Sequence, residues 1–420
     1  MEYILNTQIQ HLEESLFLST IHTQPQKESN VQQELDTKSD ERKAEYGYDD
    51  TLNTYRDKIN DIDINEWKRA RWIVNIYDFK IFAPIINRAF YKYWEIINKY
   101  DVFKDFNIDN DIVLHLAEAP GGFIQSSRLY MNKFLHSTTE HTELDDDGFQ
   151  TMKKKKHHKH DTRYNNIYTM SLIRDTDRIY NEQVYKYNTN ILTGVDNTGN
   201  INNLDNIDDI LVQSKGKLFK IITADGGFDE GVDYNNKEQL HYYLVLNEIY
   251  SAIKLQSSGG TFVIKLFDIL TDTNVELLYL LSCVYSYIRV FKPYTSRPTN
   301  SEKYIVCMGM TDDFALRETI LGNIRKMSLA LAEAFTSTND DYIPFSILYI
   351  GRVPQEFKDK IKDMNEKFQH RQYSFLCNAI NMCKNGFKNI SKNNILTQKR
   401  EDIYRKWARS NKLDKVVRID

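Results

Sequence analysis

Short apolar runs and helical patterns alternate through the middle of the chain. The apolar runs that we expect to form strands lie at 112–117, 167–172, 218–224, 261–267, 289–291 and 303–308. The stretches with three- and four-residue apolar spacing, which predict helices, lie at 122–134, 237–256 and 273–287. This alternation is typical of an α/β fold with a doubly wound, mostly parallel sheet. Ligands of such sheets bind beyond the carboxyl ends of the strands.

The segments on either side of this region have other patterns. Polar residues dominate from about 24 to 61, and such a segment buries too little apolar area to offset its ordering entropy. Between 65 and 100, apolar residues recur at helical spacing, which predicts one or two amphipathic helices broken near Pro84. After Met310 the alternation stops, and the pattern becomes mainly helical.

We therefore divide the chain into three parts. Residues 1–60 are predicted to be a mobile polar arm, 61–310 the α/β domain, and 311–420 a helical, basic C-terminal region. Residues 140–165 interrupt the α/β domain with a run of acids followed by a run of lysines and histidines. Three interpretations of this insertion remain open: a solvated surface segment, a contact to the phosphates of RNA, or a His-rich metal site.

The basic end of the chain also has two interpretations. Eight positive residues from Lys399 onward face four acids. They belong either to an ordinary terminal helix that packs through Ile403, Trp407 and Leu413, or to a surface that guides RNA.

Composition narrows the class of protein. With 420 residues and 41% hydrophobic residues, the chain can bury a sizeable core. Its net charge of −4 excludes a general polyanion binder, so any nucleic-acid surface must be local. The four cysteines form no metal-binding pattern and are expected to be reduced thiols. The N-terminus has no signal-peptide pattern, and no apolar run is long enough to span a bilayer, so we expect a soluble protein with no metal site and no membrane association.

A glycine-rich turn follows the first strand of the α/β region. Residues 119–123 read Ala-Pro-Gly-Gly-Phe and precede the helix predicted at 122–134. Paired glycines let a ligand approach the backbone closely, and the helix directs its first N–H groups at a carboxylate or phosphate. The alternative is a tight strand-to-helix turn without a ligand.

Four charged residues stand beside apolar runs. They are Lys92, Asp225, Lys265 and Glu302. Taken singly, Asp225 could stabilise a turn, Lys265 could extend its amine to the surface, and Glu302 could pair with a neighbour on the surface. Taken together they are hard to explain by packing, because a buried charge is costly unless it is paired or functional.

Several motifs together resemble the FtsJ-type ribose 2′-O-methyltransferases. The segments that carry the resemblance are 88–92, 119–123, 224–229, 259–265 and 296–304. The segment 291–302, Phe-Lys-Pro-Tyr-Thr-Ser-Arg-Pro-Thr-Asn-Ser-Glu, is closest to the cap-specific mRNA enzymes of eukaryotes and large DNA viruses. The resemblance covers roughly 87–310 and implies a Rossmann-like fold that uses S-adenosylmethionine.

The resemblance also implies roles for individual residues. The catalytic set of the family falls on Lys92, Asp225, Lys265 and Glu302. The cofactor contacts fall on Asn87, Glu118, Ala119, Pro120, Gly121, Gly122, Phe123, Asn200 and Asp225. The substrate contacts fall on Asp233, which would address the cap base, and Arg297.

Two positions depart from the pattern of the family. His115 stands at the end of the first strand, where many relatives have Asp. Asn200 stands where capping relatives have an Asp that contacts the adenine, although Asn200 could still hydrogen-bond it, or Asp196 could replace it.

The reaction explains why such a set is needed. A ribose 2′-hydroxyl is a poor nucleophile near neutral pH and must be held in line with the departing sulfur. A lysine beside the cationic sulfur is pushed toward its neutral form and can accept the hydroxyl proton, a role that we assign to Lys265. The two carboxylates would orient the lysines, and Lys92 would hold the substrate.

The sequence therefore predicts methylation of the first transcribed nucleotide of capped mRNA. Two alternatives remain: a ribosomal or transfer RNA methyltransferase, and a non-catalytic RNA-binding or scaffold subunit. Other capping or transcription proteins are the expected partners besides the RNA. The expected location is the cytoplasm, or a viral factory or virion for a viral protein, with the nucleus as the alternative.

Overall fold

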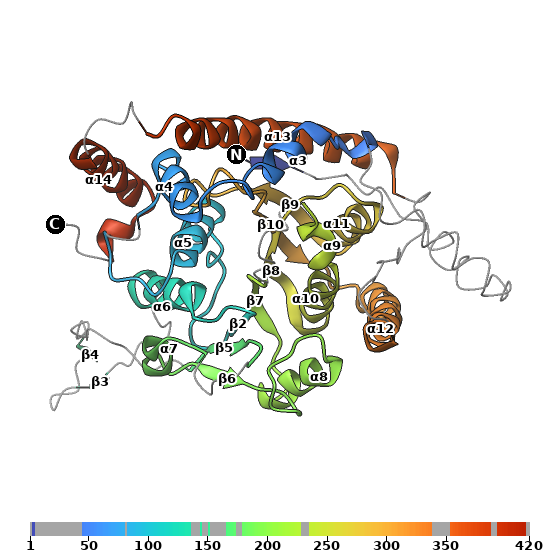
Figure 1. Cartoon of the computed structure of the whole chain (residues 1–420). Coiled ribbons are helices and arrows are strands. Elements are labelled where there is room, and N and C mark those ends of the chain that lie inside the picture. Colours follow the sequence, from blue (N-terminus) through green and yellow to red (C-terminus); the bar gives the residue numbers. More distant parts are fainter. Residues whose placement is uncertain are drawn as a thin grey trace, which may run out of the picture.

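The computed structural model describes residues 2–4, 44–79, 82–135, 143–144, 150–151, 165–173, 179–227, 235–337, 353–387 and 393–416. An 8-stranded sheet forms the centre of the molecule (Figure 1). Its strands, in spatial order, are β1 (Glu2–Ile4), β9 (Tyr285–Phe291), β10 (Lys303–Met310), β8 (Gln256–Leu266), β7 (Phe219–Ala224), β2 (Val113–Leu116), β5 (Ile167–Met170) and β6 (Asn190–Leu192).

The sheet is mostly parallel, as the sequence predicts. Neighbouring strands from β8 to β6 all run in the same direction. β10 lies antiparallel to both β8 and β9, and β1 lies antiparallel to β9. Apart from β1 at the edge, the chain builds the sheet from β2, extends it to β6 on one side, and returns to place β7 on the other side of β2. The carboxyl ends of β2 and β7 therefore flank the switch point at which ligands of doubly wound sheets bind.

Helices cover both faces of the sheet (Figure 1). One face carries α5 (Ala89–Tyr100), α6 (Gly122–Phe134) and α7 (Glu182–Lys186). The other carries α8 (Leu204–Gln213), α10 (Tyr242–Leu255), α11 (Asp272–Val284) and α12 (Phe314–Ser337). Because side chains of a strand alternate between its faces, Ile221 of β7 packs toward α6 while its neighbour Ile222 packs toward α10.

Element boundaries differ from the prediction in a few places. The helix expected at 237–256 is divided into α9 (Lys237–Leu240) and α10, and β8 begins earlier than expected. β6 and α8 were not predicted, since their segment is rich in asparagine and aspartate, which are typical of loops. Of the insertion, the described residues form only β3 (Glu143–Leu144) and β4 (Gln150–Thr151), so its three interpretations lie outside the described residues.

The polar arm ends earlier than the sequence predicts. Residues 44–46 form a 3₁₀ helix, η1, and residues 50–57 form α3 (Asp50–Asp57), capped by the Asp49 side chain. Tyr46, Leu52 and Arg56 are buried, so residues 44–60 belong to the folded body, and the prediction of a mobile arm up to residue 60 is wrong for this stretch. The composition gave a wrong prediction because a segment with few apolar residues can still fold when a long partner helix covers those residues. The rest of the predicted arm, from residue 5 to 43, lies outside the described residues.

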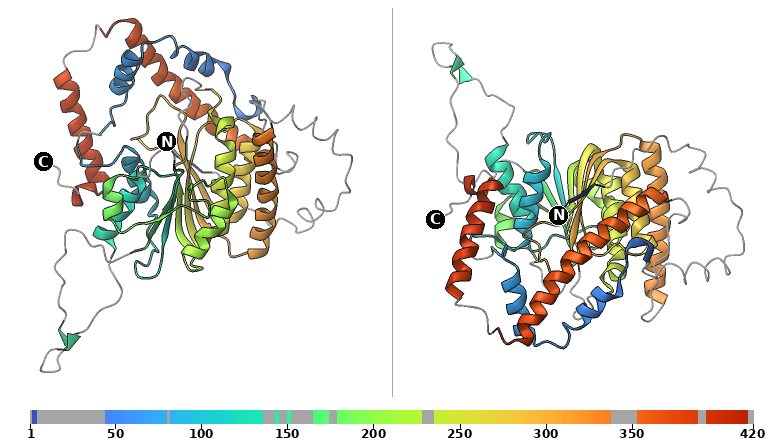
Figure 2. Two further views of the ribbon diagram at one scale, coloured as in Figure 1. Left: turned by 60° about the horizontal axis from the view of Figure 1, so that its bottom comes forward. Right: turned by 90° about the horizontal axis from the view of Figure 1, so that it is seen from above.

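That partner is the C-terminal helix α13 (Gln355–Lys384). It crosses the top of the molecule beside α3 and α4 (Ile64–Val74) (Figures 1 and 2). Trp67 of α4 and Leu52 of α3 share a buried cluster with Leu376 and Ile380 of α13. The N-terminal and C-terminal additions therefore pack on each other as well as on the α/β domain.

The last helix, α14 (Asn393–Ser410), packs beside α5. Trp407 and, in the 3₁₀ helix η3 (Leu413–Lys415) that follows, Leu413 are buried in an aromatic cluster with Trp94 of α5. Arg400 is also buried and lies over the Trp72 ring at 3.5 Å. One side of α14 therefore packs on the protein, as expected for an ordinary terminal helix. Other positive residues of this helix are exposed, as a surface that guides RNA would require. None of the described helices is long and apolar enough to cross a membrane, and all four cysteines are free.

Candidate active site

The four charged residues singled out in the sequence meet at the carboxyl ends of the central strands. Asp225 follows β7, Lys265 is next to the last residue of β8, and Glu302 directly precedes β10. Lys92 comes from the first turns of α5, which covers this part of the sheet. Four residues spread over some two hundred positions are thus brought to one place.

Two ion pairs connect the four side chains. The Lys92 Nζ lies 2.8 Å from Glu302 Oε2, and the Lys265 Nζ lies 3.3 Å from Asp225 Oδ1. Lys265 also donates to the backbone oxygen of Asp225 at 2.7 Å. All four side chains keep a small exposed fraction, between 9% and 15%, so the site is partly shielded from water and still open to a ligand.

The electrostatics of the site maintain these charges. Burial alone would lower the pKa of Lys265, but the carboxylates of Asp225, Glu302 and Glu248 outweigh it and raise the pKa above its ordinary value. Burial would raise the pKa of Glu302, yet Lys92 and Lys265 hold it well below its usual range. Lys265 is therefore charged and Glu302 is ionised at neutral pH.

Further residues orient the carboxylates, and the sequence analysis did not identify them. The Tyr304 hydroxyl donates to Asp225 Oδ1 at 2.8 Å, and the Ser296 hydroxyl donates to Glu302 Oε1 at 2.7 Å. Tyr304 stands two positions after Glu302, at the start of a strand, where side chains two apart share a face. That spacing is the signal that could have identified it.

A third lysine, Lys292, lies beneath Glu302. Its Nζ donates to the backbone oxygens of Asn300 and Glu302 at 2.9 and 2.6 Å, and to the Asn300 side chain at 2.9 Å. Burial lowers the pKa of Lys292 to about 7, with the charge of Glu302 opposing the shift. Lys292 therefore fixes the loop that carries Glu302.

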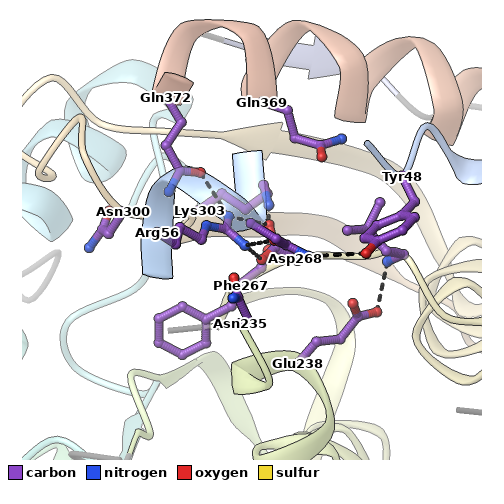
Figure 3. A network of polar contacts seen from close by, with 12 residues as sticks. Tyr48, Arg56, Asn235, Glu238, Phe267, Asp268, Asn300, Lys303, Gln369 and Gln372 are labelled. Carbon is purple, nitrogen blue, oxygen red and sulfur yellow. Dashed lines mark hydrogen bonds and ion pairs between the residues drawn. The ribbon is translucent and has the colours of Figure 1, made fainter. Parts of the chain in front are cut away.

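A second charged network lies beside the first and is fully buried (Figure 3). Arg56 of α3 makes two hydrogen bonds to Asp268, at 2.8 and 3.1 Å, and a third to Gln372 Oε1 of α13 at 3.0 Å. Gln372 in turn donates to the backbone oxygen of Thr299 at 3.0 Å. Lys303 donates to the backbone oxygen of Phe267. We call Arg56, Asp268, Gln372 and Lys303 the brace.

The brace joins the loop that follows β8, and with it Lys265, to the loop that carries Glu302. Asp268 stands three positions after Lys265, and Thr299 stands three positions before Glu302. Arg56 and Gln372 connect these two points through helices that lie outside the α/β domain. The outer helices therefore hold the two loops at a fixed distance from each other.

The glycine turn has the geometry that its sequence demands. Gly121 has a φ of +118°, and a Cβ there would lie 2.4 Å from Val184 of α7. A Cβ on Gly122 would lie 2.1 Å from Asn87 Oδ1. Both glycines are thus required, by the backbone conformation in one case and by the close approach of α5 in the other. The Asn87 side chain accepts from the N–H of Ala89, the first residue of α5, at 3.0 Å.

The residues around this turn fit a small ligand with both donor and acceptor groups. Glu118 Oε1 accepts from the N–H of Phe123 at 2.8 Å, whereas its Oε2 is buried and has no hydrogen-bond partner among the described residues. Burial and the nearby charge of Asp225 raise the pKa of Glu118 well above its ordinary value. Gly121, at the N-cap of α6, has no side chain, so the Glu118 carboxylate is the group that accepts from the first turn of this helix. Phe123 is buried and stacks on Tyr93, with ring centroids 4.5 Å apart.

The two departures have structural explanations. His115 is fully buried, and its Nδ1 lies 2.7 Å from the Thr223 hydroxyl on the neighbouring strand, so it ties β2 to β7. Burial lowers the pKa of His115 to about 3, so it is neutral. Asn200 accepts from the N–H of Asn202 at 3.0 Å, and Asp196 accepts from Thr198, Asn203 and Asn206. These side chains stabilise the loop after β6, with Asn200 at the rim of a cavity of about 610 Å³.

The predicted substrate contacts are described only in part. Arg297 is half-buried in the loop that carries Glu302, while Asp233 lies outside the described residues. Glu248 of α10 was not predicted, although its carboxylate lies behind Lys265 and a Cβ on Gly226 would meet its Oε1 at 2.2 Å. Within the described ranges, no three His, Cys, Asp or Glu side chains form a group that could hold a metal ion.

Curated relatives of the chain carry informative names. The cap-specific mRNA (nucleoside-2'-O-)-methyltransferase 2 of Drosophila melanogaster is 29% identical over 283 residues, covering 64% of this chain and 37% of that protein. The corresponding enzyme 1 of Mus musculus is 34% identical over 183 residues, covering 42% and 21%. An inactive cap-specific methyltransferase 1B of Caenorhabditis briggsae is 29% identical over 185 residues, covering 44% and 22%.

These relatives are much longer than the matched region. The chain spans 37% of the first and about a fifth of the other two. The model of the FtsJ-like methyltransferases matches residues 85–310, which contain the glycine turn and all four charged residues. With more than half of its length matched by that model, the chain belongs to the FtsJ-like methyltransferase family.

Proposed function

We propose that this protein uses S-adenosylmethionine to methylate ribose 2′-hydroxyls of RNA, at the first transcribed nucleotide of capped mRNA. The observation that carries the proposal is the meeting of Lys92, Asp225, Lys265 and Glu302 in two ion pairs at the carboxyl ends of β7 and β8. The glycine turn at the end of β2 lies on the same edge of the sheet. Membership of the FtsJ-like family supports the same reaction.

The cofactor would be held by Asn87, the turn at 118–123 and the loop after β6. Glu118 accepts from the first turn of α6 with one oxygen and offers its unpartnered Oε2 to a donor group of the cofactor. When bound, S-adenosylmethionine supplies a methyl group on a positively charged sulfur.

Lys265 is the proposed proton acceptor. A positive charge placed beside it lowers its pKa, which the surrounding carboxylates otherwise raise. Its Nζ can then take the proton of the ribose hydroxyl. Asp225, fixed by Tyr304, keeps Lys265 in place, and Glu302 does the same for Lys92, which we propose holds the substrate oxygen. Holding the hydroxyl in line with the methyl group supplies much of the acceleration.

Capped mRNA is the proposed substrate because several relatives are named for it. Asp233, beyond the Asp225 turn, and Arg297, beside Glu302, are the proposed contacts to the cap and the RNA. Recognition of a base by stacking and hydrogen bonds should persist as salt rises, whereas binding through phosphates alone weakens steeply.

Methyl transfer from labelled cofactor tests the proposal directly. The purified protein is incubated with short capped, uncapped and pre-methylated RNAs, and the modified nucleoside is identified by mass spectrometry. We expect a 2′-O-methylated first nucleotide, with faster reaction on capped RNA at moderate salt. Asp233→Ala should narrow the preference for capped RNA without changing cofactor affinity. Equal rates on capped and uncapped RNA would refute the cap preference and leave an RNA methyltransferase, such as one acting on ribosomal or transfer RNA.

A non-catalytic RNA-binding or scaffold subunit is the second candidate, because one relative is named inactive. In this chain the glycine turn is present at the end of β2 and the four charged residues form two ion pairs, which favours the enzyme. Calorimetry separates the two: the enzyme must bind S-adenosylmethionine, and a protein that binds RNA but neither binds nor consumes the cofactor would be the scaffold.

A further inference from the structure

A pocket of about 700 Å³ lies on the far side of α5 from the glycine turn, between α5, α14 and the end of β9. Four aromatic residues, Tyr77, Phe291, Tyr294 and Trp407, line it together with two lysines, Lys99 and Lys406. None of these residues belongs to the catalytic site described above. Trp94 of α5 shares a buried cluster with Trp407 of α14 and donates to the backbone oxygen of Asn411 at 2.8 Å.

Two connections in the chain link the pocket to the catalytic candidates. Lys92, Glu95 and Lys99 follow one another at helical spacing and share a face of α5, so Lys99 stands about 10 Å along the helix from Lys92. Glu95 accepts from the backbone N–H of Tyr294 at 2.8 Å, and the chain from Tyr294 leads directly to Glu302. A polymer held at Lys92 can therefore extend into the pocket.

The chemistry of the pocket matches a single nucleic-acid strand. Tyr294 is 48% exposed and lies against Tyr77, with ring centroids 5.2 Å apart, which leaves an aromatic platform open to a planar ligand. Lys99 and Lys406 are exposed at the rim. On α14 the neighbouring Arg405 is paired with Glu401 at 2.7 Å, whereas Lys406 has no ion-pair partner within the described part of the chain.

We propose that this pocket binds the transcribed strand of the RNA beyond the nucleotide that is methylated, with a base stacked on Tyr294 and phosphates near Lys99 and Lys406. The inference rests on the proposed function and adds a second contact to it. Aromatic platforms combined with a positive rim bind single strands with little sequence preference. An acidic or apolar peptide is the other occupant that the pocket would accept, and the test below distinguishes it.

The test compares capped RNAs of two lengths, a capped dinucleotide and a capped strand of roughly ten nucleotides. The variants are Tyr294→Ala and the double change Lys99→Ala with Lys406→Ala. Lys217→Ala is the matched control, because Lys217 is an exposed lysine just before β7, at the opposite end of the strands from the site. Thermal melting shows that each variant is folded.

For the wild type we expect a higher kcat/KM on the long RNA than on the short one. Tyr294→Ala and the double variant should each reduce this ratio by about tenfold, the size of one lost base stack or of two lost phosphate contacts. The double variant should also weaken the salt dependence of RNA binding, by roughly 1.4 in the slope of log affinity against log salt. Lys217→Ala should behave like the wild type in both measurements.

An unchanged ratio together with an unchanged salt slope in the double variant would overturn the proposal and leave the pocket to a peptide. Fluorescence anisotropy with the same RNAs keeps this result separate from failure of the proposed function. A wild type that methylates neither RNA, but whose RNA binding is weakened by the double change, supports the pocket and refutes the reaction.

Discussion

The catalytic candidates and the brace are two clusters of charged residues that lie side by side. They differ in the exposed fraction of their side chains and in the way their charges are paired. The lysines and carboxylates of the catalytic candidates remain 9% to 15% exposed and are joined by single ion pairs. In the brace, Arg56 and Asp268 are 3% and 7% exposed and share two hydrogen bonds. The first cluster keeps groups available to a ligand, and the second satisfies its groups internally.

The two clusters are interleaved in the sequence. Glu302 pairs with Lys92 of α5, while its neighbour Lys303 lies near the Phe368 ring of α13. They separate because consecutive side chains at a strand point to opposite faces. Proximity in sequence to a catalytic residue therefore indicates nothing about function here. The face of the sheet toward which a side chain points decides which of the two clusters it joins.

The largest effect should come from breaking the brace. Asp268→Ala leaves the Arg56 guanidinium buried without its carboxylate, which typically costs about 3–5 kcal/mol of the free energy of unfolding. Urea denaturation should show a large fall in the midpoint. The double change Arg56→Met with Asp268→Leu should recover most of the loss, since it leaves no unpaired charge. A single variant as stable as the wild type would show that the brace is not a structural element.

The catalytic cluster should respond in the opposite way. Lys265→Ala should reduce methyl transfer by more than about a hundredfold, the usual contribution of a group that moves a proton. Cofactor binding by calorimetry should be nearly normal, and the melting temperature should change far less than in Asp268→Ala. Near-normal turnover by the purified variant would remove Lys265 from the mechanism.

The glycine turn should show a mixed effect, on ligand binding and on stability. Gly121→Ala places a side chain at a φ of +118° and against Val184, which costs roughly 1–3 kcal/mol. The turn must shift to relieve this contact, so we expect weaker cofactor binding together with a modest loss of stability. Gly121→Val should do the same more strongly, with little change in RNA binding. Unchanged cofactor affinity in a folded variant, measured by calorimetry, would show that the turn does not contact the cofactor.

The smallest effect concerns Glu248. Its side chain is buried like those of the brace, but it interacts with Lys265 of the catalytic candidates. Burial raises the pKa of Glu248 to about 8, so the folded state holds this proton more tightly than the unfolded chain does. The contribution to stability is therefore full at low pH and is lost as pH rises through this pKa. Glu248→Gln cannot titrate. Its stability relative to the wild type should increase by about 1 kcal/mol between pH 7 and pH 8, measured by urea denaturation. A stability difference between Glu248→Gln and the wild type that stays constant from pH 7 to pH 8 would show that the pKa of Glu248 does not lie near this range.

Much of the fold followed from local pattern. The helix α6 begins and ends where the sequence predicts, because a glycine pair fixes its start and apolar spacing its length. The strands β2, β5 and β7 were placed within two residues, since short buried runs have few other conformations. The glycine turn and the four charged residues were found by motif, and the structure brings them to one edge of the sheet.

Other features could not be obtained from local pattern. The burial of residues 44–60 depends on α13, more than three hundred positions away, as the hydrogen bond from Asn365 to the Tyr46 backbone shows. The role of His115 depends on Thr223 of the neighbouring strand, and that of Asn200 on the turn it caps. Tyr304 and Glu248 become part of the site only when three strands and α10 are assembled around Lys265.

The sequence by itself determined the order and type of most elements, the glycine turn, and the identity of the four charged residues. The elements and the turn rest on backbone preferences and side-chain periods that act over a few residues, whereas the four charged residues were recognised by their motifs. The tertiary structure alone decided which charges face a ligand and which close the brace. That choice depends on contacts such as Arg56 to Asp268 and Gln372 to Thr299, whose partners meet only after the sheet has formed and the outer helices have packed on it.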